Sequence, residues 1–251
     1  LPRGEDNSEP MQSEPIALAA GQSLRHENAL TELFGLGPDS FGALKMVATT
    51  EDVIGMSRTY NIPASETAGT FGQGLPAVRA TEMIQGVEPQ RIIFLSEDPD
   101  SRANVGCVNG SSEPVMINVG LFNAEGEPLE TKTMDLGPYS NNQINRVFEE
   151  YAPVNGYVDV WADSDDALYY CYGSMLDNLT SDPTTILPQV PSNDTIFIPA
   201  AALAAGLQGS FFRTDVDLNN VGSTDLTYEL LWLPRGTDNS DPVRSDTFSL
   251  A

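Results

Sequence analysis

Short runs of alternating hydrophobic and polar residues recur along the chain. Clear examples are 115–122 and 227–233, in which apolar side chains occupy every second position. Clusters of Gly, Pro, Asn, Asp and Ser separate the runs, which recur about every eight to twelve residues. Because the side chains of a strand point to alternate faces, this pattern predicts many short strands, each with one buried face.

Two short stretches depart from this alternation. Leu30, Leu33 and Phe34 have the i, i+3, i+4 spacing of one helical face, and Ile144 begins the same spacing within 144–148. We therefore expect a short helical turn at each place and no long helix.

The two ends of the chain repeat one another. Residues 1–19 align without a gap with residues 233–251 and are identical at eleven of nineteen positions. Both segments begin Leu-Pro-Arg-Gly and continue through Asp-Asn-Ser. We therefore expect both ends to lie within the same kind of repeat unit.

A weaker repeat lies inside this period. Residues 213–222 resemble 102–111, and an alternating run follows each of them. The repeat unit is therefore expected to hold two related domains, domain X and domain Y. Domain Y is predicted to be complete at 87–191. Domain X is predicted to be split into its C-terminal part, 1–86, and the N-terminal part of the next domain X, 192–251.

The number of strands suggests the fold class. Each domain would have about 110 residues and about seven strands, which is typical of an immunoglobulin-like β-sandwich. The predicted fold is therefore all-β, with tandem immunoglobulin-like β-sandwich domains and short helical turns.

Three stretches of domain Y carry a resemblance to a known family. The Arg-Ala-Asn-Val stretch at 102–105, the expected hairpin at 121–126 and the Gln-Ile-Asn-Arg-Val-Phe stretch at 143–148 resemble immunoglobulin-like sandwich repeats of large secreted bacterial surface proteins. The resemblance implies an extracellular repeat module. Its motifs are structural, so it implies no active-site residues.

Cys107 and Cys171 are the only cysteines, and both lie in strand-like runs. Two interpretations stay open. A disulfide across the sandwich core would close a long loop and stabilise the fold by about 3–5 kcal/mol in an oxidising compartment. Two buried thiols would instead act as small hydrophobic side chains. We expect the disulfide, together with an extracellular or cell-surface location.

The charge balance excludes several classes of partner. Lys and Arg total 12 and Asp and Glu total 36, so the net charge is −24. Nucleic-acid phosphates and anionic membranes need a cationic surface, so neither is an expected partner. The longest apolar run, 196–207, contains Pro199 and is too short to cross a bilayer. We therefore expect no membrane insertion.

Catalytic motifs are missing from the sequence. It contains no Gly-Xaa-Ser-Xaa-Gly elbow, no His-Glu-Xaa-Xaa-His pair and no Walker A loop. His26 is the single histidine, and we interpret it as a surface residue near the start of a helical turn. We therefore expect that the chain is not an enzyme.

Acidic loops supply the only candidate metal ligands. Calcium prefers several hard oxygen ligands at about 2.3–2.6 Å, and loops at the end of a sandwich can provide them. No loop has the Asp-Xaa-Asp-Xaa-Asp-Gly pattern, so a solvated, self-repelling surface is the alternative. The possible calcium ligands are Asp98, Asp100, Asp163, Asp165 and Asp166. No other cofactor is expected.

Domain Y also concentrates aromatic residues. They could form a stacking platform for a sugar, or they could pack in the core and between strands, which is the interpretation we favour. The residues are Tyr157, Trp161, Tyr169, Tyr170 and Tyr172.

The split of domain X leads to the expected function. A half sandwich leaves strand edges unpaired and half of a core exposed. The tail could close domain X within its own chain, complete it in the next molecule, or belong to one long covalent array. Because a closed domain needs the repeated segment once, we favour a filament or surface array of copies joined head to tail. The expected assembly residues are Leu1, Pro2, Arg3, Gly4, Leu233, Pro234, Arg235 and Gly236.

Two other functions stay open. The chain could be an adhesin-type module that binds carbohydrate or protein, in which case Trp161 or Tyr172 would contact a glycan. It could also be an accessory domain of a secreted hydrolase.

Overall fold

The structure is a computed structural model that describes residues 1–62, 69–190 and 195–250, and nearly all of its regular structure is strand. The chain divides into two compact units, Leu1–Val190 and Pro191–Ala251. The all-β class predicted from the sequence is confirmed. In the described part of the chain, none of the helices has the length and the apolar character that crossing a membrane requires.

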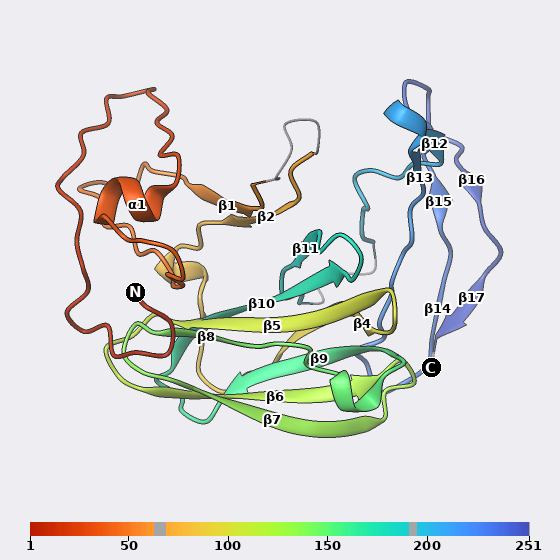
Figure 1. The fold of residues 1–251 in the computed structure, drawn as a ribbon. Helices are drawn as coiled ribbons and strands as arrows, with labels where there is room; N and C mark the ends of the chain where they lie inside the picture. Colours follow the sequence, from red (N-terminus) through yellow and green to blue (C-terminus); the bar gives the residue numbers. More distant parts are fainter. Residues whose placement is uncertain (63–68, 191–194, 251) are drawn as a thin grey trace. The chain divides into compact units, whose positions relative to one another are not determined.

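A two-layered β-sandwich forms the centre of the first unit (Figure 1). Every neighbouring pair of strands in it is antiparallel. The first sheet has the order β11 (Pro183–Ile186), β10 (Leu168–Asp177), β5 (Ser101–Asn109) and β8 (Asn141–Ile144), with β3 (Ile84–Gln85) also paired to β10. The second sheet has the order β4 (Gln90–Glu97), β9 (Val154–Ala162), β6 (Val115–Asn123) and β7 (Pro128–Leu136).

The alternating pattern of β6 shows why these residues form a sandwich. Ile117, Val119 and Leu121 are fully buried, whereas Met116 is 41% exposed on the outer face. Burying each such aliphatic side chain contributes about 1.5–3 kcal/mol. In the described part of the chain, all buried hydrophobic residues lie between Ile84 and Ile186, close to the limits expected for domain Y.

A disulfide joins Cys107 and Cys171, as predicted. The expectation that it would cross the sandwich core is wrong. Cys107 on β5 and Cys171 on β10 are direct partners in one sheet, with their Cα atoms 4.0 Å apart. Hydrophobic alternation predicted that both side chains are buried in the core, but it does not predict which strands are neighbours.

The first predicted helical turn is confirmed, and the second, predicted within 144–148, is wrong in its position. Helix α1 (Ala29–Phe34) covers the first, and Gly35 ends it in the left-handed conformation with φ 65°. The second begins later than expected, because Ile144 still belongs to β8 and the helical turn is η2 (Glu149–Tyr151).

The rest of the first unit has little regular structure. It contains a hairpin of β1 (Met56–Tyr60) and β2 (Gly72–Pro76), and the short helix η1 (Ala80–Glu82). The Thr185 hydroxyl donates a hydrogen bond of 2.7 Å to the backbone oxygen of Gly74, which ties this hairpin to β11.

The second unit consists of short strand pairs, in which β12 pairs with β13, β14 with β17 and β15 with β16. Its elements are β12 (Ala204–Ala205), η3 (Leu207–Gly209), β13 (Phe211–Phe212), β14 (Leu226–Tyr228), β15 (Leu231–Trp232), β16 (Val243–Arg244) and β17 (Phe248–Leu250). A second closed sandwich therefore stays a prediction.

We predict that the double variant Cys107→Ala/Cys171→Ala lowers the free energy of unfolding by about 4 kcal/mol, because the bond closes a long loop in the unfolded chain. Urea unfolding of the oxidised wild type and of the variant measures the difference. A reducing agent should destabilise the wild type and leave the double variant unchanged. Equal stability of oxidised wild type and variant would contradict the prediction.

Candidate functional site

The first copy of the repeated segment folds into a tight turn at residues 1–7, which we call the first turn. Gly4 has φ 73°, in the left-handed region that glycine adopts readily. The buried Asn7 amide donates hydrogen bonds to the backbone oxygens of Pro2 at 3.0 Å and Glu5 at 3.1 Å. These bonds close the turn without any second strand.

The Arg3 side chain anchors the first turn to the sandwich. Its Nε donates to Oδ1 of Asn142 at 3.0 Å, and its Nη2 donates to the backbone oxygen of Gln143 at 2.7 Å. A planar guanidinium suits such a two-point contact, and hydrogen bonds from a charged donor are stronger than neutral ones. The contact is therefore specific for arginine.

Two backbone hydrogen bonds add to this anchor. The N–H of Gly4 donates to the oxygen of Asn141 at 2.9 Å, and the N–H of Asn7 donates to the oxygen of Pro138 at 2.9 Å. Strand β8 is the last strand of its sheet, so its outer edge is open to such partners. The acceptor residues form what we call the turn-binding surface: Pro138, Asn141, Asn142 and Gln143.

The first turn also contacts its own half of the predicted domain X. Pro2 forms an isolated β-bridge with Gly42, and the Ala43 N–H donates to the oxygen of Leu1 at 3.0 Å. The expected assembly residues Leu1 to Gly4 are thus brought together with both the sandwich and the segment around Gly42.

The second copy of the segment shares much of this internal geometry at residues 233–239, which we call the second turn. Gly236 has φ 74°, and the Asn239 amide donates to the backbone oxygen of Pro234 at 3.1 Å. The N–H of Ser240 donates to Asp238 at 2.9 Å. The equivalent bond in the first turn, from Ser8 to Asp6, is 2.8 Å long.

The two turns also share one electrostatic feature. Hydrogen bonds from the hydroxyl and N–H of Ser8 lower the pKa of Asp6. Hydrogen bonds from the N–H and hydroxyl of Ser240 lower the pKa of Asp238 in the same way. Both carboxylates therefore stay ionised and close the end of their turns.

The turns differ in what their arginines contact. Arg3 is half-buried against the turn-binding surface, whereas Arg235 is exposed. Within the described residues, Arg235 takes part in no hydrogen bond or ion pair. One copy of the turn is thus docked, and the other presents its anchor to solvent.

The second turn lies in the connection of a hairpin that is antiparallel like the β6–β7 hairpin of the sandwich. We call residues 226–250 the tail hairpin. In it Leu226 pairs with Leu250, as Val115 pairs with Leu136 in the sandwich. The Tyr228 and Phe248 rings lie 5.4 Å apart between their centroids.

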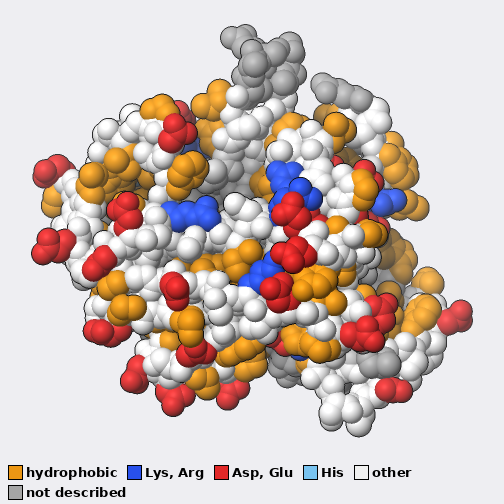
Figure 2. Space-filling view, turned by 60° about the horizontal axis from the view of Figure 1, so that its bottom comes forward, with side chains coloured by type: hydrophobic (Ala, Val, Ile, Leu, Met, Phe, Trp, Pro, Cys, Tyr) orange, Lys and Arg blue, Asp and Glu red, His pale blue; other side chains and the backbone are white. Residues whose placement is uncertain are grey.

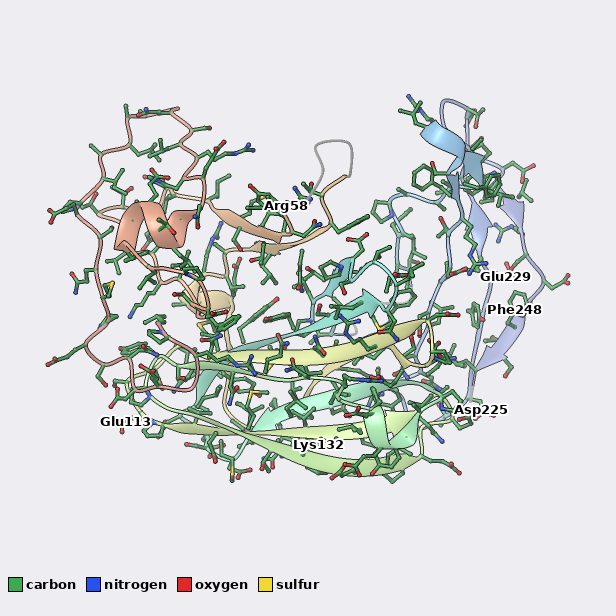
Figure 3. The ribbon with its side chains drawn as sticks, in the orientation of Figure 1. Arg58, Glu113, Lys132, Asp225, Glu229 and Phe248 are labelled. Carbon is green, nitrogen blue, oxygen red and sulfur yellow. A yellow bond between two sulfur atoms is a disulfide. The ribbon has the colours of Figure 1, made fainter. Side chains whose placement is uncertain are left out.

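A polar bond supports the same hairpin. Figure 3 shows Glu229 and Phe248 on this element, and Glu229 accepts a hydrogen bond of 3.1 Å from Arg244. In contrast, residues 9–18, which follow the first turn, form no strand. The second turn is thus followed by paired strands of a hairpin, whereas the first turn is not.

The tail hairpin exposes the side chains whose counterparts form the core of the sandwich. Val115, Val119 and Leu121 are between 0% and 7% exposed. Their counterparts by alignment are 38%, 41% and 51% exposed, and they are Leu226, Leu230 and Trp232.

The C-terminal part of the predicted domain X, residues 1–86, shows the same mismatch. Val158, Val160 and Cys171 are fully buried in the sandwich. Their counterparts are between 55% and 89% exposed, and they are Leu44, Met46 and Ile54. Both halves therefore carry core-type side chains that are not packed.

The possible calcium ligands lie in two separate loops. Asp98 and Asp100 precede Ser101, which pairs with the last residue of β10, whereas 163–166 precede the first residue of β10. A strand of this length separates the two loops by about 30 Å, because each residue advances about 3.3 Å. Within the described residues, no three His, Cys, Asp or Glu side chains gather as a metal site.

The individual carboxylates have structural partners instead. Asp98 accepts hydrogen bonds from Ser101 and from the N–H of Asp100. Burial opposes ionisation of Asp98, but these hydrogen bonds outweigh it and lower its pKa. Asp163 accepts a hydrogen bond from Asn118, and Asp165 and Asp166 are exposed. Figure 2 shows acidic side chains spread over the visible face, with few basic ones.

The candidate aromatic residues do not form one platform. Tyr169 is fully buried, and burial raises its pKa to about 12. Tyr170 and Tyr172 lie on the opposite face of β10, while Tyr157 and Trp161 belong to β9 in the other sheet.

A shallow groove nevertheless lies on the outer face of the second sheet. It has a volume of about 360 Å³ and is lined by Val87, Pro89, Phe122, Asp159 and Trp161. We call it the aromatic groove.

Stacking and ionic contacts fix the side chains next to the groove. The Phe122 and Tyr157 rings stack at 4.9 Å, and the Arg91 guanidinium lies 4.1 Å from the Tyr157 ring centroid. Arg91 donates to both oxygens of Asp159 at 2.7–2.8 Å, and this bonding raises its pKa.

Sequence reasoning missed the turn-binding surface and one buried ion pair. Glu97 is fully buried, and it accepts hydrogen bonds from Arg146 at 2.7–2.8 Å and from the Ala103 N–H at 3.3 Å. This pair holds the loop after β8, next to the buried residues Val147 and Phe148. No local sequence pattern marks either feature, because the partners are far apart in the chain.

Comparisons with known proteins give no family. No protein-family model, no curated protein and no solved structure matches the chain.

We predict that Arg3→Ala releases the first turn, because the remaining backbone bonds lose their charged anchor. Hydrogen exchange at the Gly4 and Asn7 amides should become about tenfold faster or more. NMR at low protein concentration measures both amides. Arg79→Ala removes an exposed arginine of the same unit and is the matched control. Unchanged exchange in Arg3→Ala would show that arginine does not anchor the turn.

Proposed function

We propose that the chain is an extracellular structural repeat protein that forms a filament or surface array by head-to-tail completion of β-sandwich domains. In this proposal the tail of one copy, 192–251, packs with residues 1–86 of the next copy. Together they make domain X, an immunoglobulin-like sandwich like domain Y. The observation that carries the proposal is that both halves expose side chains whose sandwich counterparts are buried.

The energetic argument favours completion. Leu226, Leu230 and Trp232 are 38%, 41% and 51% exposed, so burying the rest of them would yield about 2–4 kcal/mol. Association costs about 4–15 kcal/mol because translational and rotational freedom is lost, and these three side chains offset part of that cost. The half that receives them adds Leu44 and Met46, which are 55% and 59% exposed. Burial of these side chains on both halves therefore favours assembly.

Charge and redox chemistry fit the proposed setting. A net charge of −24 makes free copies repel one another, and salt at physiological strength screens that repulsion beyond about 8 Å. Assembly should therefore strengthen as salt is added. The Cys107–Cys171 disulfide is compatible with an oxidising, extracellular compartment.

We predict that Trp232→Ser weakens self-association at least tenfold, because it removes the largest exposed side chain of the tail hairpin. Sedimentation velocity over a range of concentrations measures the association. Leu179→Ser is the matched control, since Leu179 is 92% exposed on a loop of the sandwich and has no role in completion. Equal association of wild type and Trp232→Ser would contradict the proposal.

The aromatic groove favours a second candidate function, binding of carbohydrate. Binding sites for small molecules combine aromatic walls with a few fixed polar groups. Phe122 and Trp161 provide ring faces for the apolar side of a sugar, and Asp159 provides a carboxylate for its hydroxyl groups. Protein binding and a role beside a secreted hydrolase stay predictions without a supporting contact.

For this candidate, a glycan array probed with the wild type should give binding that Trp161→Ala abolishes. Met116→Ala changes an exposed side chain on the outer face of the same sheet and should bind as the wild type does. The carbohydrate function is wrong if no glycan binds, or if Trp161→Ala binds as well as the wild type.

A further inference from the structure

We propose that the turn-binding surface is an exchange site, which takes the second turn of another copy in place of its own first turn. The proposal rests on the proposed function and adds a named contact to it. The ligand is residues 233–239 of a second copy of this chain. The receptor is the turn-binding surface on the edge strand β8 of the sandwich.

The second turn carries every group that the first turn uses. Arg235 stands where Arg3 stands, so its guanidinium can donate to Asn142 and to the backbone oxygen of Gln143. The N–H of Gly236 corresponds to that of Gly4, which donates to Asn141. The N–H of Asn239 likewise corresponds to that of Asn7, which donates to Pro138. Because the two turns share the φ angle of their glycine, the bond from Asn to the Pro oxygen and the bond from the Ser N–H to Asp, the ligand already has much of the docked geometry.

Charge favours the incoming turn. Glu5 of the first turn is replaced by Thr237 in the second turn. The second turn therefore brings one negative charge fewer to a protein whose net charge is −24. Both residues at this position are exposed, so the replacement removes no buried contact.

Preorganisation also favours the incoming turn. The second turn is held at both ends by the tail hairpin, in which β14 pairs with β17 and β15 with β16. The first turn is followed by residues 9–18, which form no strand. A ligand that is already ordered loses less conformational entropy when it binds.

The occupant is the tail of a second copy, as head-to-tail completion of domain X requires, and this tail belongs to a compact unit of its own. The resident turn is tethered to its sandwich at an effective concentration on the order of millimolar. Exchange therefore occurs when the hairpin and the apolar side chains of the tail add binding free energy to the turn. The displaced segment is 1–18, which removes the duplication that a closed domain X cannot accommodate.

Two full-length variants test the exchange. Arg235→Ala removes the anchor of the incoming turn and leaves the receptor intact. Asn142→Arg leaves the incoming turn intact and places a like charge where its arginine would bind. Each variant alone should associate about tenfold more weakly than the wild type or worse, as measured by sedimentation velocity. Arg213→Ala, another exposed arginine of the tail, is the matched control and should associate as the wild type does.

A mixture of the two variants gives the decisive result. Arg235→Ala then supplies one intact receptor and Asn142→Arg one intact second turn. An equimolar mixture should therefore form dimers and no higher oligomers. Failure of the mixture to pair, although both variants keep the circular dichroism and melting temperature of the wild type, would overturn the exchange. If Asn142→Arg does not fold, the Arg235→Ala result decides by itself.

The outcomes separate the exchange from the proposed function. If the wild type assembles and Arg235→Ala assembles equally well, the exchange is wrong and completion of domain X by apolar packing stands. If the wild type remains a monomer at every concentration, as closure of the tail within its own chain would give, the proposed function fails and the exchange fails with it.

Discussion

A strand with one apolar face is stable in water only when a second sheet covers that face, and this constraint governs the whole chain. The sandwich satisfies it, since Ile117, Val119 and Leu121 of β6 are fully buried. The tail hairpin has the same antiparallel pairing and the same alternation, yet Leu230 and Trp232 are exposed. The difference between these two hairpins is the physical basis of the proposed assembly.

The sandwich provides a rigid support for the candidate contact. Its disulfide links β5 to β10, and the Glu97–Arg146 ion pair fixes the loop that follows β8. Strand β8 is therefore held by β5 and by the loop that follows it, while its outer edge has no strand partner among the described residues. An uncovered strand edge can pair with other chains and cause aggregation, and the docked turn covers part of this edge. In the proposed filament, the same edge becomes the place where copies recognise one another.

Much of the architecture could be predicted from the sequence, because periodicity reports burial. The alternation of 115–122 predicted both a strand and its buried face, and the i, i+3, i+4 spacing of Leu30, Leu33 and Phe34 predicted α1. The two cysteines were correctly expected to bond. Which sheet they share could not be predicted, because alternation places a side chain inside or outside and does not identify its neighbouring strand.

The candidate site could be predicted only in part. The repeat led to the prediction that Arg3 and Arg235 are assembly residues, since identical segments point to a shared role. It could not identify Asn142 or Gln143, because a hydrogen bond between residues 139 positions apart leaves no local pattern. The buried Glu97 was equally invisible, as its charge alone predicts a solvated side chain.

Cryo-electron microscopy of the full chain at assembling concentration and physiological salt tests the central claim most directly. Our account predicts filaments or arrays with one chain per axial repeat, in which the tail of one copy packs with residues 1–86 of its neighbour and residues 233–239 lie on strand β8 of that neighbour. Discrete monomers without an axial repeat would contradict the account, whereas filaments in which residues 1–7 still occupy that strand edge would contradict the exchange alone.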